Sequence, residues 1–203
     1  MESLTQRLAR CNVNTNNWGT GDAKTVQSLL TEIEKGDCSL LELDGKLCRE
    51  LSVLYVVVLS DNKILMEKEQ VLTDGRTRIR TIPLAEKIVS GEDLLVATSR
   101  AIKEELEFLG EPNESTQPSS HSFEILEDTL KLVSIESKMS ASYPNLMCTY
   151  NTHMITVMIR SLPKTEFTSF EKRGDRYQIT RWQWMSVDDA KKINKEVRMY
   201  FDN

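Results

Sequence analysis

Residues 91–108 read GEDLLVATSRAIKEELEF, and the rest of the chain is interpreted outward from them. A helix that begins near Asp93 places Leu95, Ile102 and Leu106 on one apolar stripe, because these positions recur at helical spacing. The charged side chains point to other faces and are Arg100, Lys103, Glu104 and Glu107. The stretch therefore predicts an amphipathic helix that is buried on one side.

Two adjacent carboxylates lie within this predicted helix. Glu104 and Glu105 are about 100° apart around a helix axis, and both border the surface over Ala101. Just before the helix, Gly91 provides backbone freedom, and Glu92 lies where a negative charge favours the helix N-terminus. The pattern predicts two acidic groups that are directed toward one place.

These residues resemble the box of the Nudix hydrolase family, which falls on residues 86–108 when it is anchored on Arg100. The positions that match besides this arginine are Glu92, Ile102, Glu104, Glu105 and Phe108. The departures are Glu86 for the first glycine, Ala101 for the glutamate that follows the arginine, and Glu107 for the closing glycine. The resemblance implies an α+β fold, namely an α/β/α sandwich around a mixed, mostly antiparallel central sheet.

The resemblance also implies a metal-dependent hydrolase that cleaves a pyrophosphate bond in a nucleoside diphosphate-linked substrate. Glu104 and Glu105 would be catalytic and, with Glu92, would hold Mg²⁺ or Mn²⁺, while Arg100 would orient the pair. Ala101 stands where the hydrolases of the family carry a carboxylate. Its presence removes about one unit of negative charge from a site that needs oxygen ligands.

Other interpretations of the same residues stay open. Ala101 and Glu107 favour a catalytically impaired Nudix-fold module that binds a nucleotide, a phosphorylated metabolite or a protein partner. A solvated acidic helix face, with an ion pair between Arg100 and Glu104, is a third explanation. Glu86, in the loop beside the helix, is a candidate for a compensating carboxylate.

Strands are predicted before the box, and one of them carries alternating arginines. The expected strands cover 38–43, 46–59, 63–72 and 76–84, with turns at Asp44-Gly45, Asp61-Asn62 and Asp74-Gly75. In the last strand Arg76, Arg78 and Arg80 fall on one face, which suggests a strip of guanidinium groups that bind substrate phosphates. Cross-strand pairing with Glu67 and Glu69 explains these arginines as well.

The remaining segments complete the expected domain organisation. Residues 1–20 lack periodicity and are interpreted as a flexible arm, and 21–203 as a single Nudix-like domain with a mobile loop at 109–122. A helix capped by Asp22 and stopped by Gly36 opens this domain. Downstream we expect strands over 123–139, 147–159 and 177–185, a polar connection over 161–176, and a closing helix from Ser186.

Composition limits the partners and the compartment. A net charge of −5 and a pI near 5.3 argue against a nucleic-acid surface, which leaves a nucleotide-type small molecule as the expected ligand. The sequence has no apolar run of membrane-spanning length. Four cysteines without a CxxC pair favour reduced thiols and a cytoplasmic location, although organelle targeting stays open. Neither His121 nor His153 has a neighbour at zinc-ligand spacing, and the sequence is compatible with a homodimer.

Overall fold

The structure is a computed structural model that describes residues 2–72, 74–112, 116–173 and 176–202. The chain divides into two compact units. Unit 1 contains residues 1–53, 87–92 and 134–152, and unit 2 contains residues 54–86, 93–133 and 153–203. The domain boundaries expected from the sequence remain a prediction.

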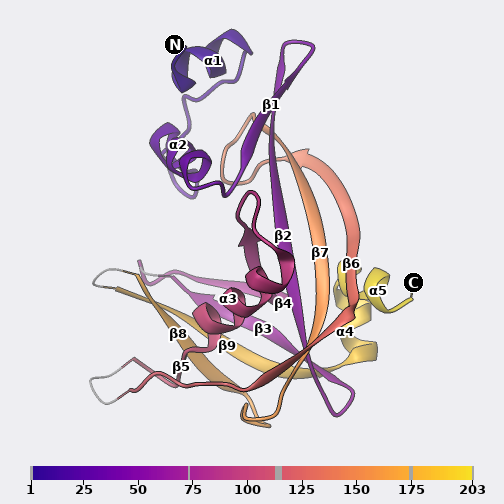
Figure 1. Cartoon of the computed structure of the whole chain (residues 1–203). Coiled ribbons are helices and arrows are strands. Elements are labelled where there is room, and N and C mark those ends of the chain that lie inside the picture. The colour runs from indigo at the N-terminus through magenta and orange to yellow at the C-terminus, as the bar shows by residue number, and fades with distance from the viewer. Residues whose placement is uncertain (1, 73, 113–115, 174–175, 203) are drawn as a thin grey trace. The chain divides into compact units, whose positions relative to one another are not determined.

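Unit 1 is built from two short helices and a β-hairpin (Figure 1). The helices are α1 (Leu4–Arg10) and α2 (Val26–Glu34), and the hairpin joins β1 (Ser39–Leu43) to β2 (Lys46–Ser60). Asp44 and Gly45 both have positive φ angles, 51° and 71°, as a tight hairpin turn requires. This turn is therefore confirmed where the sequence placed it.

The first twenty residues are structured where the sequence led us to expect an arm. Ser3 and Gln6 form a capping box that starts α1, and Leu8 on this helix is 1% exposed. Trp18 is also buried, and its Nε1 donates to the carbonyl oxygen of Pro144 at 2.8 Å. A seven-residue helix is too short to show periodicity, and its burial comes from distant residues.

The second helix begins later than predicted. Thr25, rather than Asp22, is the N-cap of α2, and its side chain accepts from the backbone N–H of Ser28. Gly36 follows the helix with a φ of 78°, so the predicted stop is confirmed. A Cβ atom at Gly36 would lie 3.2 Å from Val89, which adds a close approach to the conformational reason for glycine.

Unit 2 is organised around a sheet. It contains the whole of β3 (Lys63–Val71), β5 (Phe108–Leu109), β8 (Phe167–Arg173) and β9 (Arg176–Ser186), and part of β4 (Thr77–Ile88), β6 (Phe123–Met139) and β7 (Met147–Ile159). With β2, they hydrogen-bond in the order β5-β8-β9-β3-β4-β2-β7-β6. The pairs β3–β4, β3–β9, β5–β8 and β8–β9 are antiparallel. The predicted polar connection over 161–176 is wrong in part, because it contains β8.

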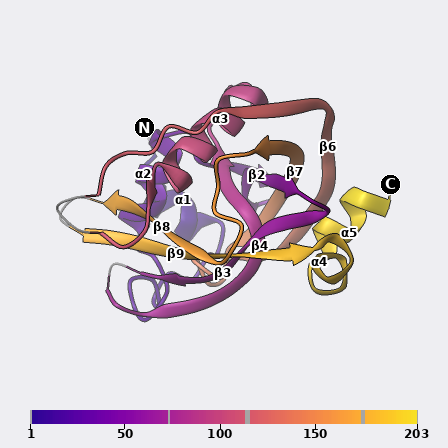
Figure 2. The same cartoon turned by 90° about the horizontal axis from the view of Figure 1, so that it is seen from below.

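Helices pack against these strands in unit 2. Figure 2 shows α3 (Leu94–Leu106) to one side of β3 and β9, and α4 (Val187–Ile193) after the end of β9, followed by α5 (Lys195–Asp202). Ile64 and Met66 of β3 share a buried cluster with Val197 and Tyr200 of α5. Because strand side chains alternate between faces, Leu65 and Glu67 point to the opposite side of the sheet.

The regular pairing of β3 is interrupted near Glu67. Its register shifts between Glu67 and Glu69 against both β4 and β9, which marks a β-bulge. On β4, Thr81 has a φ of 67°, a strained conformation for a β-branched residue. Its carbonyl oxygen accepts from the side-chain amide of Asn194 at 3.4 Å.

The predicted α+β class with a mostly antiparallel sheet is confirmed. Within the described ranges, no helix combines the length and apolar character that a membrane span requires.

Candidate functional site

The box helix forms where the sequence predicts it. Asp93 is the N-cap of α3, and its Oδ1 accepts from the backbone N–H groups of Leu95 and Val96 at 2.9 and 3.2 Å. Ile102 and Leu106 of the predicted apolar stripe are at most 2% exposed. The helix is therefore fixed by its cap and by its buried face.

Arg100 on α3 lies close to two carboxylates, those of Glu104 and Glu86. Its Nη1 lies 3.2 Å from Glu104 Oε2, one turn along the helix, and 3.6 Å from Glu86 Oε1, at the end of the preceding strand segment. The ion pair between Arg100 and Glu104 that the sequence predicts is present. The contact with Glu86 brings the residue that replaces the first box glycine to the same guanidinium group.

The two adjacent glutamates have different surroundings. The side chain of Glu104 is 42% exposed, whereas Glu105 is 7% exposed as a residue. Ala101, which both were expected to border, is completely buried. At the position where hydrolases of the resembled family carry a further glutamate, this chain thus has only the buried methyl group of Ala101.

Glu92 belongs to unit 1, and its carboxylate accepts a hydrogen bond from the loop before the helix. Its Oε2 accepts from the backbone N–H of Val89 at 3.0 Å, and its own N–H donates to the Val89 carbonyl oxygen. Glu92 therefore braces the loop that precedes the helix. Its proposed role as a metal ligand remains a prediction.

The contacts of the box carboxylates decide how readily they could hold a divalent cation. In the described part of the chain, no three His, Cys, Asp or Glu side chains converge at metal-binding distances. The guanidinium group of Arg100 lies against Glu104 and Glu86 and brings a positive charge that a cation would have to displace. A hard cation needs several oxygen ligands, so Glu104 would have to leave Arg100 before it could hold Mg²⁺ or Mn²⁺, and the metal-binding role of Glu92, Glu104 and Glu105 remains a prediction.

The arginines of β4 have nearby partners. Arg76 lies 2.8 Å from Asp74, Arg78 donates to Gln70 Oε1 at 2.6 Å, and Arg80 lies 2.8 Å from Glu67. The predicted cross-strand pairing with Glu67 is therefore present, while Glu69 pairs with Arg181 instead. The proposed phosphate-binding role of Arg76, Arg78 and Arg80 remains a prediction.

A cavity of about 450 Å³ lies along another face of α3. Its lining residues are Ser99, Ile102, Lys103, Glu107, Pro118, Ser119, Ser120, His121 and Phe123. Lys103 is exposed, and none of the acidic side chains that the structure describes pairs with it. The cavity wall thus contains the Lys103 ammonium group and several serine hydroxyl groups, together with the Glu107 carboxylate.

His121 closes one side of this cavity. Its Nε2 lies 3.0 Å from the carbonyl oxygen of Leu106 at the end of α3, and its Nδ1 lies 2.8 Å from Ser161 Oγ. The predicted mobile loop at 109–122 includes 113–115, which lie outside the described residues, but His121 is held at both ring nitrogens. The sequence did not indicate that Lys103 and His121 line the same cavity. They are 18 positions apart, and only the folded path of the loop brings His121 back to the end of α3.

Comparison with known proteins gives similarity to solved structures alone. No family model and no curated protein matches the chain. A Nudix hydrolase from Nitrosomonas europaea is 18% identical over 75% of this chain and 86% of its own, with a TM-score of 0.42. A UDP-X diphosphatase is 11% identical over 87% and 70%, with a TM-score of 0.41. A mutator MutT protein from Bacillus halodurans is 13% identical over 74% and 80%, with a TM-score of 0.39.

Proposed function

We propose that this chain is a Nudix-like module that binds a nucleotide-type small molecule through a phosphate group and does not hydrolyse it efficiently. The observation that carries the proposal is the cavity beside the box helix, with Lys103 and hydroxyl groups in its wall. An ammonium group without a carboxylate partner can bind phosphate without breaking an existing ion pair. The buried Ala101 and the absence of a three-carboxylate group among the described residues favour binding over turnover.

Hydrolysis of a pyrophosphate bond in a nucleoside diphosphate-linked substrate is the second candidate function. One observation favours it, namely that Arg100 holds Glu86 next to Glu104. Glu86 is the residue that we considered as a replacement for the missing box carboxylate. Mg²⁺ or Mn²⁺ would be the metal in that case, and its ligands would have to rearrange away from Arg100.

We expect Lys103→Ala to weaken phosphate-ligand binding about tenfold or more, because a hydrogen bond to a charged group contributes about 1.5–3 kcal/mol. Nucleoside triphosphates, nucleotide sugars, dinucleoside polyphosphates, NADH and coenzyme A are screened by thermal shift, and the best ligand is titrated calorimetrically. Lys195→Ala is the matched control, because it removes an exposed lysine from α5 in the same unit. Equal affinity of the two variants would contradict the site.

We expect no product when the same panel is incubated with Mg²⁺ or Mn²⁺ and followed by phosphorus NMR. If product forms, Glu105→Gln and Glu86→Gln identify the source, because loss of a catalytic acid or base lowers the rate about 10²- to 10⁴-fold. Turnover that both variants abolish would replace the binding proposal by the hydrolase. Turnover that neither variant changes would indicate a contaminating enzyme.

A further inference from the structure

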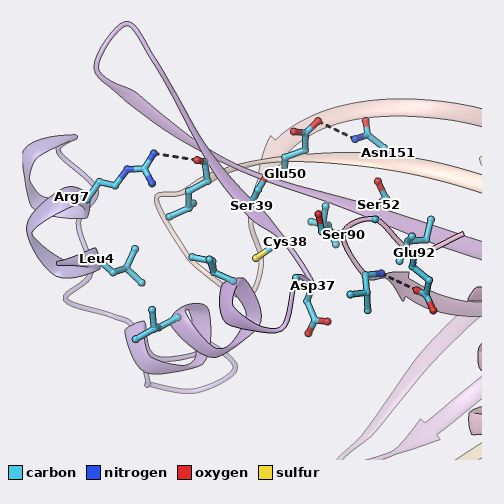
Figure 3. Close-up of a pocket in the computed structure, with 18 of the residues that line it drawn as sticks. Leu4, Arg7, Asp37, Cys38, Ser39, Glu50, Ser52, Ser90, Glu92 and Asn151 are labelled. Carbon is cyan, nitrogen blue, oxygen red and sulfur yellow. Dashed lines mark hydrogen bonds between the residues drawn. The ribbon is translucent and has the colours of Figure 1, made fainter. Parts of the chain in front are cut away.

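Unit 1 contains a larger cavity that has no part in the site beside α3. Its volume is about 780 Å³, within the range of pockets that hold small molecules. Figure 3 shows side chains from α1, α2, the β1–β2 hairpin and the loop before Glu92 around it, together with Asn151. All of its lining residues belong to unit 1.

Part of the wall is apolar. The apolar side chains are Leu4, Leu30, Ile33, Leu40, Leu51, Ile88 and Val89. Leu51 is 6% exposed, and the others are half-buried, so they cover one another only in part. An aliphatic ligand that displaced water from these groups would gain affinity in proportion to the apolar surface that it covered.

The charged groups of the wall are mostly acidic. Four carboxylates line the cavity, from Glu2, Asp37, Glu50 and Glu92, against one cation, Arg7. The Arg7 guanidinium is already engaged, because it donates to the Leu40 carbonyl oxygen at 3.2 Å and lies 3.7 Å from Glu42. The cavity therefore disfavours an anion and favours a cation.

Two of the four carboxylates are neutralised within unit 1. Glu2 lies 2.9 Å from Arg10, and Asp37 lies 3.7 Å from Lys87. Glu50 differs from them, because no cation among the residues that the structure describes pairs with it. This half-buried carboxylate is the group that a positively charged ligand would complement.

Glu50 is also held in one orientation. Its Oε1 accepts from the side-chain amide of Asn151 at 3.1 Å, as Figure 3 shows. A carboxylate has about four acceptor positions, and this bond uses one of them. The remaining positions are available to an ammonium group, which donates three hydrogen bonds.

We propose that the cavity in unit 1 binds an organic ammonium ion with an aliphatic body, with the cation at Glu50 and the carbon chain against the leucine, isoleucine and valine side chains. The charge of the wall selects the cation, and the apolar surface selects against small inorganic cations. The site shares no residue with the cavity beside α3, so it stands or falls independently of the phosphate-binding proposal.

The test uses n-hexylamine, 1-hexanol and hexanoate with the full chain in isothermal titration calorimetry at pH 7. We expect binding of the amine, at least tenfold weaker binding of the alcohol, and no binding of the carboxylate, since a charge-assisted hydrogen bond changes affinity about tenfold or more. Lack of amine binding would overturn the proposal. So would an alcohol that binds as tightly as the amine.

Variants locate the ammonium group. Glu50→Gln keeps an oxygen that accepts from Asn151, so the fold should survive, but it removes the charge and should weaken amine binding at least tenfold. Glu34→Gln removes an equal charge from an exposed position of α2 outside the cavity and should change the affinity less than twofold. Equal affinities of the two variants would show that general charge attraction, not this site, binds the amine.

Discussion

Replacement of Glu32 by leucine is expected to lower the free energy of unfolding by about 3–5 kcal/mol, because it leaves a buried guanidinium group without its carboxylate. Arg49 Nη2 donates to Glu32 Oε2 at 2.5 Å, and the two residues are 4% and 6% exposed. Two further contacts of Arg49 are weaker, namely Cys148 Sγ at 3.4 Å and the ring of Tyr143 at 5.3 Å. Neither can replace the lost charge.

The experiment is urea denaturation followed by tryptophan fluorescence, in which Trp18 reports on the core of unit 1. Glu34→Leu is the matched control, because it makes the same substitution at an exposed position of the same helix. Its effect should stay within about 0.5 kcal/mol. A loss of less than about 1 kcal/mol for Glu32→Leu would mean that Arg49 reaches water once its partner is gone.

Acid conditions provide a second measurement of the same pair. Burial alone would raise the pKa of Glu32, but the Lys24 hydrogen bond and the charges of Lys87 and Arg49 outweigh it and lower the pKa to about 2. A carboxyl group whose pKa falls on folding stabilises the protein above its ordinary pKa of 4.5. This stability should be lost between about pH 4.5 and pH 2 in the wild type, and Glu32→Leu should show a smaller loss.

The second large effect is expected at Glu67, whose contribution to stability should fall as the pH rises rather than as it falls. This carboxylate is 1% exposed, and burial raises its pKa to about 7, although Arg80 and Arg78 reduce the rise. The Arg80 Nε atom lies 2.8 Å from Glu67 Oε2, yet within the described chain neither atom completes a hydrogen bond of good geometry. The charge of Glu67 is therefore compensated only in part.

A carboxyl group whose pKa rises on folding binds more protons in the folded state between the two pKa values. Its contribution is fully present below about pH 4.5 and is lost as the pH rises through about 7. The shift corresponds to about 3 kcal/mol across this window. We expect Glu67→Gln to remove that part of the pH dependence, whatever its effect on the absolute stability.

Urea denaturation at pH 4.5, 5.5, 6.5 and 7.5 measures the slope for both proteins. Glu69→Gln is the control, because it removes a carboxylate two residues away on β3 that pairs with Arg181. This variant should keep the wild-type slope. A Glu67→Gln protein whose slope matches the wild type would show that Glu67 is ionised throughout the range.

The sequence predicts those elements whose signals are local. The turn at Asp44-Gly45, the helix that begins near Asp93 and the strand over residues 147–159 each depend on residues close to one another in the chain, and all three are present. The strand β8 was missed because Thr168, Ser169 and Glu171 hide its alternation. Ser169 is nevertheless 1% exposed, and Trp182 of the neighbouring strand donates to its buried hydroxyl group.

The candidate site was less accessible to such reasoning. Spacing correctly paired Arg100 with Glu104, because a helix sets that distance by itself. The partners of Arg78 and Arg80 depend on the bulge between Glu67 and Glu69, which shifts the register and is invisible in a linear pattern. The burial of Ala101 and Glu105 likewise depends on elements that are remote in the chain.

The packing of the first twenty residues has a practical consequence for anyone who expresses part of this chain. A clone that starts at residue 21, as the flexible-arm interpretation would recommend, omits Leu8, Val13 and Trp18, all of which belong to a buried cluster with Tyr143 and Leu146. The truncated polypeptide would expose the aromatic and aliphatic side chains that these residues cover, and such surfaces promote aggregation. A purification tag should therefore be added ahead of Ser3, the N-cap of α1, and should not replace residues 3–20.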